Sequence, residues 1–414
     1  MSTATDESGR GPKRSALFRE RDMRFYLASR FLWVAATQIC NVAVGWTVYD
    51  VTRSAWALGL VGLAAFLPRL FLTLIAGMIA DRYDRRRIIA ICLVVDAVIT
   101  LLLLVVVLQS EVNVGAIYAL FVMLGIVRGF VGPASQALVA NLVPREQFSR
   151  VIGMSSSIGQ IATIVGPATG GLLFLGGAWA PFALAAAFYM AAAGFNVALR
   201  TRGQEISTAP PTFSDAFAGL RFIRGRPVLL GAISLDMFAV LLGGAVALLP
   251  IIASDILHVG PAGLGLLRAM PAVGAAMLGA TLAWFPLRRR VGWKLFAATT
   301  VFGLATIGLG LSRELWLTMA FLWLIGASDV FSVVIRQTLV QANTPDPMRG
   351  RVAAVNSLFI GASNELGEFE SGATAALLGL VPAIVAGGAG TIAVALTWAW
   401  LFPSLRRRDH LVDP

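Results

Sequence analysis

The hydrophobic pattern divides the chain into long apolar runs separated by short polar connections. Each run is close to the roughly 20 residues that a helix needs to cross a bilayer. The pattern therefore predicts an all-α membrane protein with twelve transmembrane helices. We place these helices at residues 24–50, 55–80, 87–109, 113–142, 148–173, 178–199, 228–254, 261–286, 293–312, 315–342, 351–377 and 381–402.

Lysine and arginine are concentrated in every second connection. The opposite connections carry only Arg53 and Arg313. Short loops rich in Lys and Arg are retained in the cytoplasm. We therefore expect a multi-pass protein of the plasma (inner) membrane with both termini inside. The expected cytoplasmic set is the amino-terminal tail, Arg82–Arg87, Arg145 and Arg150, Arg200–Arg226, Arg288–Lys294, Arg349 and Arg351, and Arg406–Arg408.

The longest polar connection separates two groups of six runs. Within it, Phe213, Phe217, Leu220 and Ile223 recur at helical spacing with charged residues between them, which is typical of an amphipathic helix on a membrane surface. An unstructured linker is the alternative. We expect a cytoplasmic tail at 1–21, a six-helix bundle at 22–200, a cytoplasmic linker at 201–227, a second bundle at 228–402 and a tail at 403–414.

The two groups are related by a repeat. Pro144 and Arg150 correspond to Pro345 and Arg351 at a constant offset of 201 residues. A parallel repeat of six helices is the plan of transporters that rock two bundles about a site near the midplane. The same offset relates Gly125, Gln136, Gly166 and Gly171 to Gly326, Gln337, Gly367 and Gly372.

Composition excludes several other classes of protein. The chain is 57% hydrophobic and 13% charged, and its net charge of +11 is spread over separate short loops and tails, which argues against a nucleic-acid-binding face. Cys40 and Cys92 lie inside apolar runs, and the two histidines lie near a loop and in the tail, so we expect no disulfide framework, metal site or catalytic triad. The phosphate-binding sequence GxxxxGK[ST] does not occur, and we expect no cofactor.

A cluster of charged residues in the hairpin after residue 76 resembles a known family motif. Its sequence, GMIADRYDRRR, begins at Gly77, reaches Asp81 four positions later and ends in Arg85, Arg86 and Arg87. It resembles the cytoplasmic signature of the major facilitator superfamily, which implies a gating motif. We expect Gly77 to allow close helix approach and Asp81 to pair with Arg85 or with helix caps in the inner gate. The alternative is that the arginines only set topology.

The fourth run contains a buried cation. Arg128, followed by Gly132, resembles the arginine motif that the superfamily carries on this helix, although Val131 replaces the usual polar residue. A charge in the bilayer costs on the order of 3 kcal/mol or more unless it is paired or hydrated, so it is a functional candidate. Alternatively, Arg128 neutralises Asp96 in the third helix.

The fifth run contains Gly166, Pro167, Gly170 and Gly171, which resemble the motif of the antiporter members of the superfamily. The proline removes a backbone donor and bends the helix, and the glycines let a neighbouring helix pack against the bend. Generic tight packing is the alternative.

Carboxylates in the second half are the candidates for proton coupling. Glu365 and Glu368 are three residues apart and share a helix face near the membrane midplane, and Asp236 and Asp329 are the next candidates. Burial disfavours the charged form, so such a group can bind a proton on one side of the membrane and release it on the other. Alternatively, these carboxylates neutralise the buried cations Arg30, Arg128, Arg268 or Arg336.

Residues near 235–253 and 344–372 resemble the branch of proton-coupled exporters that includes siderophore exporters and macrolide efflux proteins. The resemblance implies a monomeric secondary transporter in the lipid bilayer, with protons and a small-molecule substrate as its partners, that exports an amphiphilic, siderophore-like or drug-like solute by alternating access. An uptake permease or a lysolipid flippase is the alternative on the same fold. A membrane enzyme or a non-transporting receptor is the alternative of another class.

Overall fold

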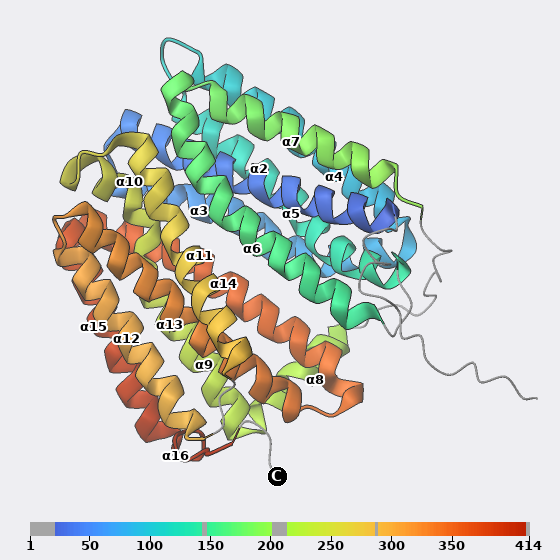
Figure 1. Cartoon of the computed structure of the whole chain (residues 1–414), viewed down its shortest axis with the longest axis vertical. Coiled ribbons are helices and arrows are strands. Elements are labelled where there is room, and N and C mark those ends of the chain that lie inside the picture. Colours follow the sequence, from blue (N-terminus) through green and yellow to red (C-terminus); the bar gives the residue numbers. More distant parts are fainter. Residues whose placement is uncertain (1–20, 143–146, 201–212, 286–288, 411–414) are drawn as a thin grey trace, which may run out of the picture.

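The structure, a computed structural model, describes residues 21–142, 147–200, 213–285 and 289–410. In these ranges the regular elements are helices, which form two groups (Figure 1). The first group consists of α2 (Arg21–Thr52), α3 (Ala55–Arg82), α4 (Arg85–Val107), α5 (Val114–Leu142), α6 (Phe148–Leu173), the 3₁₀ turn η2 (Phe174–Gly176) and α7 (Ala180–Val197).

The second group begins with α8 (Phe213–Arg224), the helix that the amphipathic spacing predicts, which contacts α14 through Gly219 and the backbone of Arg351. It continues with α9 (Pro227–Leu242), η3 (Ala245–Leu248), α10 (Leu249–Ile251), η4 (Ile252–Ile256), α11 (Gly260–Trp284), α12 (Val291–Leu311), α13 (Leu315–Ala342), α14 (Asp346–Leu378), α15 (Leu380–Leu401) and α16 (Pro403–Arg406).

Eleven helical spans in the described ranges are long and apolar enough to cross a membrane. The all-helical membrane fold is thus confirmed. Helix α14, with 33 residues, is not among the eleven because its six charged side chains lower its hydropathy. The twelfth span stays a prediction.

The seventh predicted helix is not continuous. Helix α9 ends at Leu242, and the chain continues through Gly243 and Gly244 into the short elements η3, α10 and η4, the last of which is a π-helix. A Cβ on Gly243 would lie 2.9 Å from the carbonyl oxygen of Ala239, so close packing favours glycine at this break. Irregular backbone is tolerated at membrane depth when protein surrounds it, and η3 is largely buried.

Each group has its own apolar core. The largest core cluster, which contains Ile39, Leu93 and Leu124, lies within the first group, and the other clusters lie mainly in the second. One cluster crosses between the groups, because Val42 and Leu58 pack with residues of η3, α10 and α11. The two groups are therefore separate packing units that share apolar contacts at one end.

The two groups meet through two helix pairs, α6 with α11 and α3 with α14. Gly171 and Gly265 are in contact at the first crossing, and a Cβ on Gly171 would lie 2.8 Å from the Cα of Gly265. Gly59 and Gly372 make the second crossing, where a Cβ on Gly372 would lie 2.7 Å from the Cα of Gly59. Both crossings lie at the C-terminal ends of α6 and α14. We call this the closed end.

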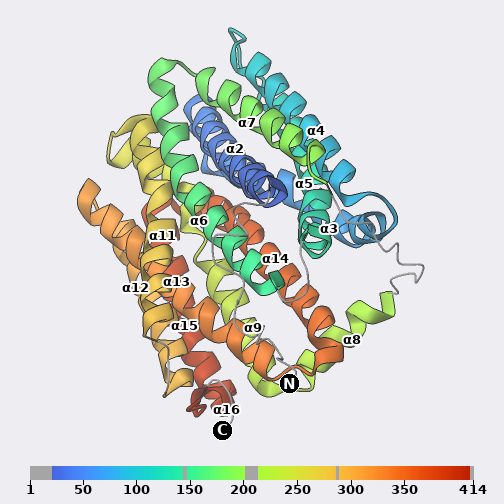
Figure 2. The same ribbon diagram turned by 45° about the vertical axis from the view of Figure 1, so that its right-hand side comes forward.

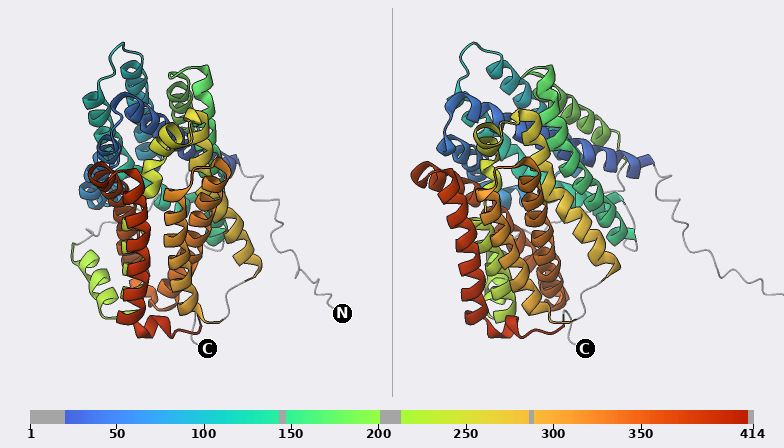
Figure 3. Two further views of the ribbon diagram at one scale, coloured as in Figure 1. Left: turned by 90° about the vertical axis from the view of Figure 1, so that its left-hand side faces the viewer. Right: turned by 60° about the vertical axis from the view of Figure 1, so that its left-hand side comes forward.

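The other end of the molecule carries the arginine-rich connections. The backbone N–H of Arg290 donates to Asp409, and Arg86 donates to the carbonyl of Leu199, so charged segments far apart in sequence lie together there. The axes of α6 and α11 diverge toward this end (Figures 1 and 2). Figure 3 shows α16 at this end of the second group, far from α10. We call it the arginine-rich end.

Candidate functional site

A cavity lies between the two groups of helices, with a volume of about 130 Å³. Helices α2, α3 and α5 line it from the first group, and η3, α11 and α14 line it from the second. This central cavity combines apolar surface with charged and amide side chains. Its lining residues are Asn41, Gly45, Leu58, Val61, Gly62, Ala65, Phe121, Arg128, Ala247, Arg268, Glu365 and Glu368.

Glu365 and Glu368 both face the central cavity, as their three-residue spacing predicts. Glu365 forms an ion pair with Arg69 of α3, with 2.7 Å between Oε1 and Nη1. The other oxygen of Glu365, Oε2, is buried and makes no hydrogen bond with any residue that the structure describes. Glu368 interacts electrostatically with Arg268 of α11 and with Glu365. Two carboxylates of α14 therefore face cations on helices of both groups.

Arg69 is a functional candidate that the sequence prediction missed. It follows Pro68 inside a long apolar run, and a cation in such a run was the available signal. The sequence pattern gives no indication that α3 and α14 cross at this level, so it does not identify Glu365 as the partner.

Arg128 also reaches the central cavity. Its Nη1 donates to Oδ1 of Asn41 and its Nη2 donates to the hydroxyl of Tyr189, both at 3.4 Å. Asp96 on α4 is fully buried, and within the described ranges neither of its carboxylate oxygens makes a hydrogen bond. Arg128 and Asp96 attract each other electrostatically without the direct ion pair that was the sequence-based alternative.

Asp236 and Asp329 lie elsewhere, in the core of the second group. Asp236 on α9 forms an ion pair with Arg336 on α13, at 3.1 Å between Oδ2 and Nη2, and both side chains are buried. The Nη1 of Arg336 donates to Oδ1 of Asn356 at 2.9 Å. Asp329 interacts electrostatically with both members of the pair. The four predicted coupling carboxylates thus fall into two separate sites.

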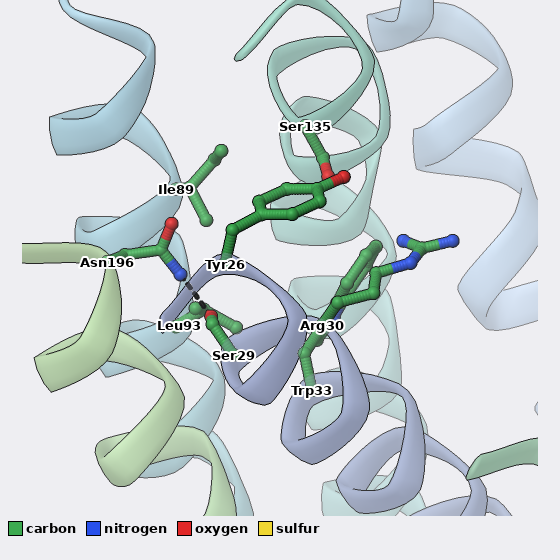
Figure 4. Close-up of a pocket in the computed structure, with 8 residues that line it drawn as sticks. All are labelled: Tyr26, Ser29, Arg30, Trp33, Ile89, Leu93, Ser135 and Asn196. Atoms are coloured by element: carbon green, nitrogen blue, oxygen red, sulfur yellow. Dashed lines mark hydrogen bonds between the residues drawn. The ribbon is translucent and has the colours of Figure 1, made fainter. Parts of the chain in front are cut away.

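Arg30 lines a small pocket between α2, α4, α5 and α7 (Figure 4). Its guanidinium lies over the ring of Trp33, 4.8 Å from the ring centroid, and its Nε is buried without a hydrogen-bond partner among the described residues. Figure 4 shows the side chain pointing away from the hydrogen bond between Asn196 and Ser29. Arg30 is not among the residues that line the central cavity.

In the described part of the charged hairpin, Asp84 is the acid that makes the visible contacts. Asp84 caps α4 by accepting a hydrogen bond from the backbone N–H of Arg86 at 3.0 Å, and it forms ion pairs with Arg86 and Arg87. An aspartate directly before a helix is a standard capping signal, which the sequence prediction did not use. The side chain of Asp81 lies outside the described part of the structure, as does the surrounding of Gly77.

The glycine motif on α6 makes contacts on two sides. Gly166 and Gly170 face α2, where an added Cβ would lie about 3 Å from backbone atoms of Ala35 and Ile39. Gly171 faces α11 across the boundary between the groups, and the carbonyl of Pro167 faces Gly265. The motif is therefore both a packing surface inside the first group and half of a crossing between the groups.

Polar side chains join the two groups at the closed end. Arg53 donates from Nη1 to the hydroxyl of Ser254 at 2.8 Å and lies 3.5 Å from Oδ1 of Asp255. The hydroxyl of Tyr49 donates to the other oxygen of Asp255, and Asp50 holds the guanidinium of Arg53 at 2.6 Å. Arg53 and Ser254 are separated by 201 residues, the offset of the repeat. We call these five residues the latch.

Comparison with known proteins agrees with this geometry. Residues 16–410 match the model of the transmembrane secretion effector family. The enterobactin exporter EntS of Citrobacter koseri is 25% identical over 396 residues, which cover 93% of this chain and 92% of that protein. The exporter of the same name from Shigella boydii serotype 18 is 25% identical over 397 residues, with the same coverage.

Solved structures share the fold. A variant of the nucleoside transporter NupG superposes with a TM-score of 0.76 at 11% identity and covers 92% of this chain and 100% of its own. A bacterial homologue of the human lysosomal transporter Spinster, in an inward-facing and unoccupied conformation, has a TM-score of 0.71 at 15% identity and covers 96% and 97%. These relatives are transporters and not enzymes. The chain belongs to the transmembrane secretion effector family of major facilitator transporters.

Proposed function

We propose that the protein is a proton-coupled exporter that moves an amphiphilic organic solute through the central cavity by alternating access. The observation that carries this proposal is the position of Glu365 and Glu368, two carboxylates that face one cavity between two separately packed groups of helices. The names of its curated relatives favour a siderophore-like solute, and the mixed apolar and charged lining suits an amphiphilic molecule.

The proposed orientation follows from charge. Arginine-rich connections stay in the cytoplasm, so the arginine-rich end faces inward and both termini are cytoplasmic. The latch and the two glycine crossings then close the cavity on the outer side. In this orientation a solute enters from the cytoplasm or the inner leaflet, which is the direction that an exporter requires.

The proposed coupling step uses the ion pair between Glu365 and Arg69. This pair joins α14 to α3, and therefore one group of helices to the other. When the carboxyl binds a proton, it loses its negative charge and its attraction to the guanidinium. Proton binding therefore weakens a contact between the groups, and proton release restores it. Glu368, which faces Arg268, is the second carboxyl at which the same exchange occurs.

Everted membrane vesicles test this proposal. Vesicles that contain the protein and have a lumen more acidic than the medium should accumulate enterobactin or a fluorescent amphiphilic dye. Vesicles without the protein should not. Replacing Glu365 or Glu368 with Gln keeps the shape of the side chain but removes the ionisable group, so at least one of these variants should lose gradient-driven accumulation while retaining solute binding.

The matched control is Glu370→Gln. Glu370 lies on the same helix, where it accepts a hydrogen bond from Thr374, but it does not line the central cavity. Vesicles that contain the Glu370→Gln variant should accumulate solute as vesicles with the unmodified protein do. Gradient-driven accumulation that persists in both single variants and in the double variant would show that the coupling carboxylate is elsewhere. Accumulation only in right-side-out vesicles would show uptake and would overturn export.

A further inference from the structure

A second pocket lies inside the second group of helices, away from the central cavity. It is formed by α9, α12 and α13 and has a volume of about 10 Å³, which is room for one water-sized ligand. Its polar lining consists of two carboxylates, Asp236 and Asp329, and three hydroxyls, Thr299, Ser328 and Ser332; the remaining lining side chains are Ala239, Val240 and Phe302. No residue of this pocket lines the central cavity, so it is a distinct site.

The charges at this pocket do not balance. Arg336 forms an ion pair with one carboxylate, that of Asp236. Asp329 makes no hydrogen bond or ion pair among the described residues, although it interacts electrostatically with Asp236 and Arg336. With both acids ionised, the cluster carries a net charge of −1 inside a membrane-spanning bundle. A buried net charge of this kind is costly unless a proton or a bound cation neutralises it.

The hydroxyl oxygens of the pocket are free to bind a ligand through their lone pairs. Thr299 donates its hydrogen to the carbonyl of Leu295 at 3.1 Å, and Ser328 donates to the carbonyl of Leu324 at 2.7 Å. Each hydroxyl has one hydrogen to donate, so its oxygen keeps lone pairs for a ligand in the pocket. Ser332 is 7% exposed, lines the pocket and makes no hydrogen bond in the part of the chain that the structure describes.

The repeat provides an internal comparison. At an offset of 201 residues, Asp329 corresponds to Arg128 in the first group. There Arg128 supplies a permanent positive charge that attracts the buried Asp96, so with Asp96 ionised the two charges sum to zero. In the second group the equivalent position is acidic, so the protein itself does not supply the balancing charge. A bound cation has the right sign to take this role.

We propose that this pocket binds a single Na⁺ ion, with Asp329 as the principal charged ligand and the oxygens of Asp236, Thr299, Ser328 and Ser332 around it. Hard cations bind oxygen ligands, and the carboxylates and hydroxyls of this pocket supply such oxygens. One monovalent cation brings the cluster to zero charge, whereas a divalent cation leaves a buried charge of +1. The site adds a bound ion to the proposed transporter without depending on the direction of transport.

Equilibrium binding of radioactive sodium and thermal unfolding of the purified full-length protein test the proposal. Both are measured in NaCl and in choline chloride at equal ionic strength. A ligand that binds only the folded state stabilises it, so NaCl should raise the unfolding midpoint and sodium should bind saturably. Asp329→Asn removes the charge of the principal ligand and should weaken the apparent sodium affinity by at least about 10-fold, the smallest loss that is typical even for a supporting group.

Two further variants keep the test decisive if Asp329→Asn folds poorly. Thr299→Val keeps the side-chain shape but removes the oxygen, and Ser332→Ala removes a hydroxyl that makes no hydrogen bond within the described residues. Both should weaken sodium binding, and Glu370→Gln should not change it. The proposal is overturned if the unmodified protein binds no sodium, or if these variants bind sodium as tightly as the unmodified protein.

Discussion

At the scale of single residues, the ion pair between Arg69 and Glu365 is the contact best placed to respond to a proton. It is partly open to the cavity, since 48% of the arginine side chain and 21% of the glutamate side chain are exposed. Exposed pairs contribute only about 0–1 kcal/mol to stability. A contact of this strength can break and re-form during each transport cycle without unfolding either group of helices.

We predict that Arg69→Gln lowers gradient-driven export by roughly 5-fold, the factor that corresponds to about 1 kcal/mol. Arg69→Lys keeps the charge and should retain more activity than Arg69→Gln. Initial export rates, normalised to the amount of protein in the membrane, provide the measurement. Equal rates for the Gln and Lys variants would show that the charge of Arg69 plays no part.

At the residue scale, the sequence could predict local geometry but not contacts between distant helices. The spacing of Glu365 and Glu368 along one helix places them on one face, and both line the central cavity. Ion pairs between helices could not be predicted from the sequence pattern, because the partners are far apart in the chain. Arg69, the partner of Glu365, is 296 residues away, and Arg336, the partner of Asp236, is on α13. The role of Asp84 as a helix cap could have been predicted from its position directly before α4.

At the scale of helices, two glycine crossings hold the groups together. Gly171 with Gly265 joins α6 to α11, and Gly372 with Gly59 joins α14 to α3. Gly171 and Gly372 correspond in the repeat, so equivalent positions on equivalent helices make equivalent contacts. Small residues allow such backbone approach in membrane proteins, where packing drives helix association. These parallel contacts support the predicted repeat.

We predict that Gly171→Ala disfavours the closed end, because its Cβ would lie 2.8 Å from the Cα of Gly265. Overpacking of this kind typically costs about 1–3 kcal/mol. A cysteine placed at His258, in a variant without the native cysteines, should then react faster with an impermeant thiol reagent. Gly153→Ala is the matched control on the same helix, since no atom lies within 4 Å of its added Cβ. Unchanged labelling in Gly171→Ala relative to the control would contradict this account of the crossing.

Helix positions were largely predictable because each span must match the bilayer. The predicted run at 315–342 coincides with α13, and the other predicted ends, apart from that of the seventh run, agree with the structure to within five residues. The break after Leu242 was not predicted, because an apolar run of this length reads as one helix. Its cause is tertiary: Gly244 meets the backbone of Gly367 on α14, a neighbour that the sequence pattern does not reveal.

At the scale of the whole molecule, the contacts of the closed end link the two groups, and the central cavity lies between the groups. The latch, the two glycine crossings and the shared apolar cluster lie at this end. The latch residues are polar and partly exposed, so their contacts can exchange with water when the groups separate. Transport by alternating access requires this separation, which rigid packing units can undergo about a central site.

The central claim is therefore that this end must open for transport. The most direct measurement uses a protein without Cys40 and Cys92 that carries Arg53→Cys and Ser254→Cys, whose native side chains are 2.8 Å apart. A short bifunctional thiol reagent should link the two groups and abolish solute accumulation in everted vesicles, and a cleavable version of the reagent should allow activity to return on reduction. Each single-cysteine protein, treated in the same way, should remain active. Full transport by the cross-linked protein would contradict alternating access through the closed end.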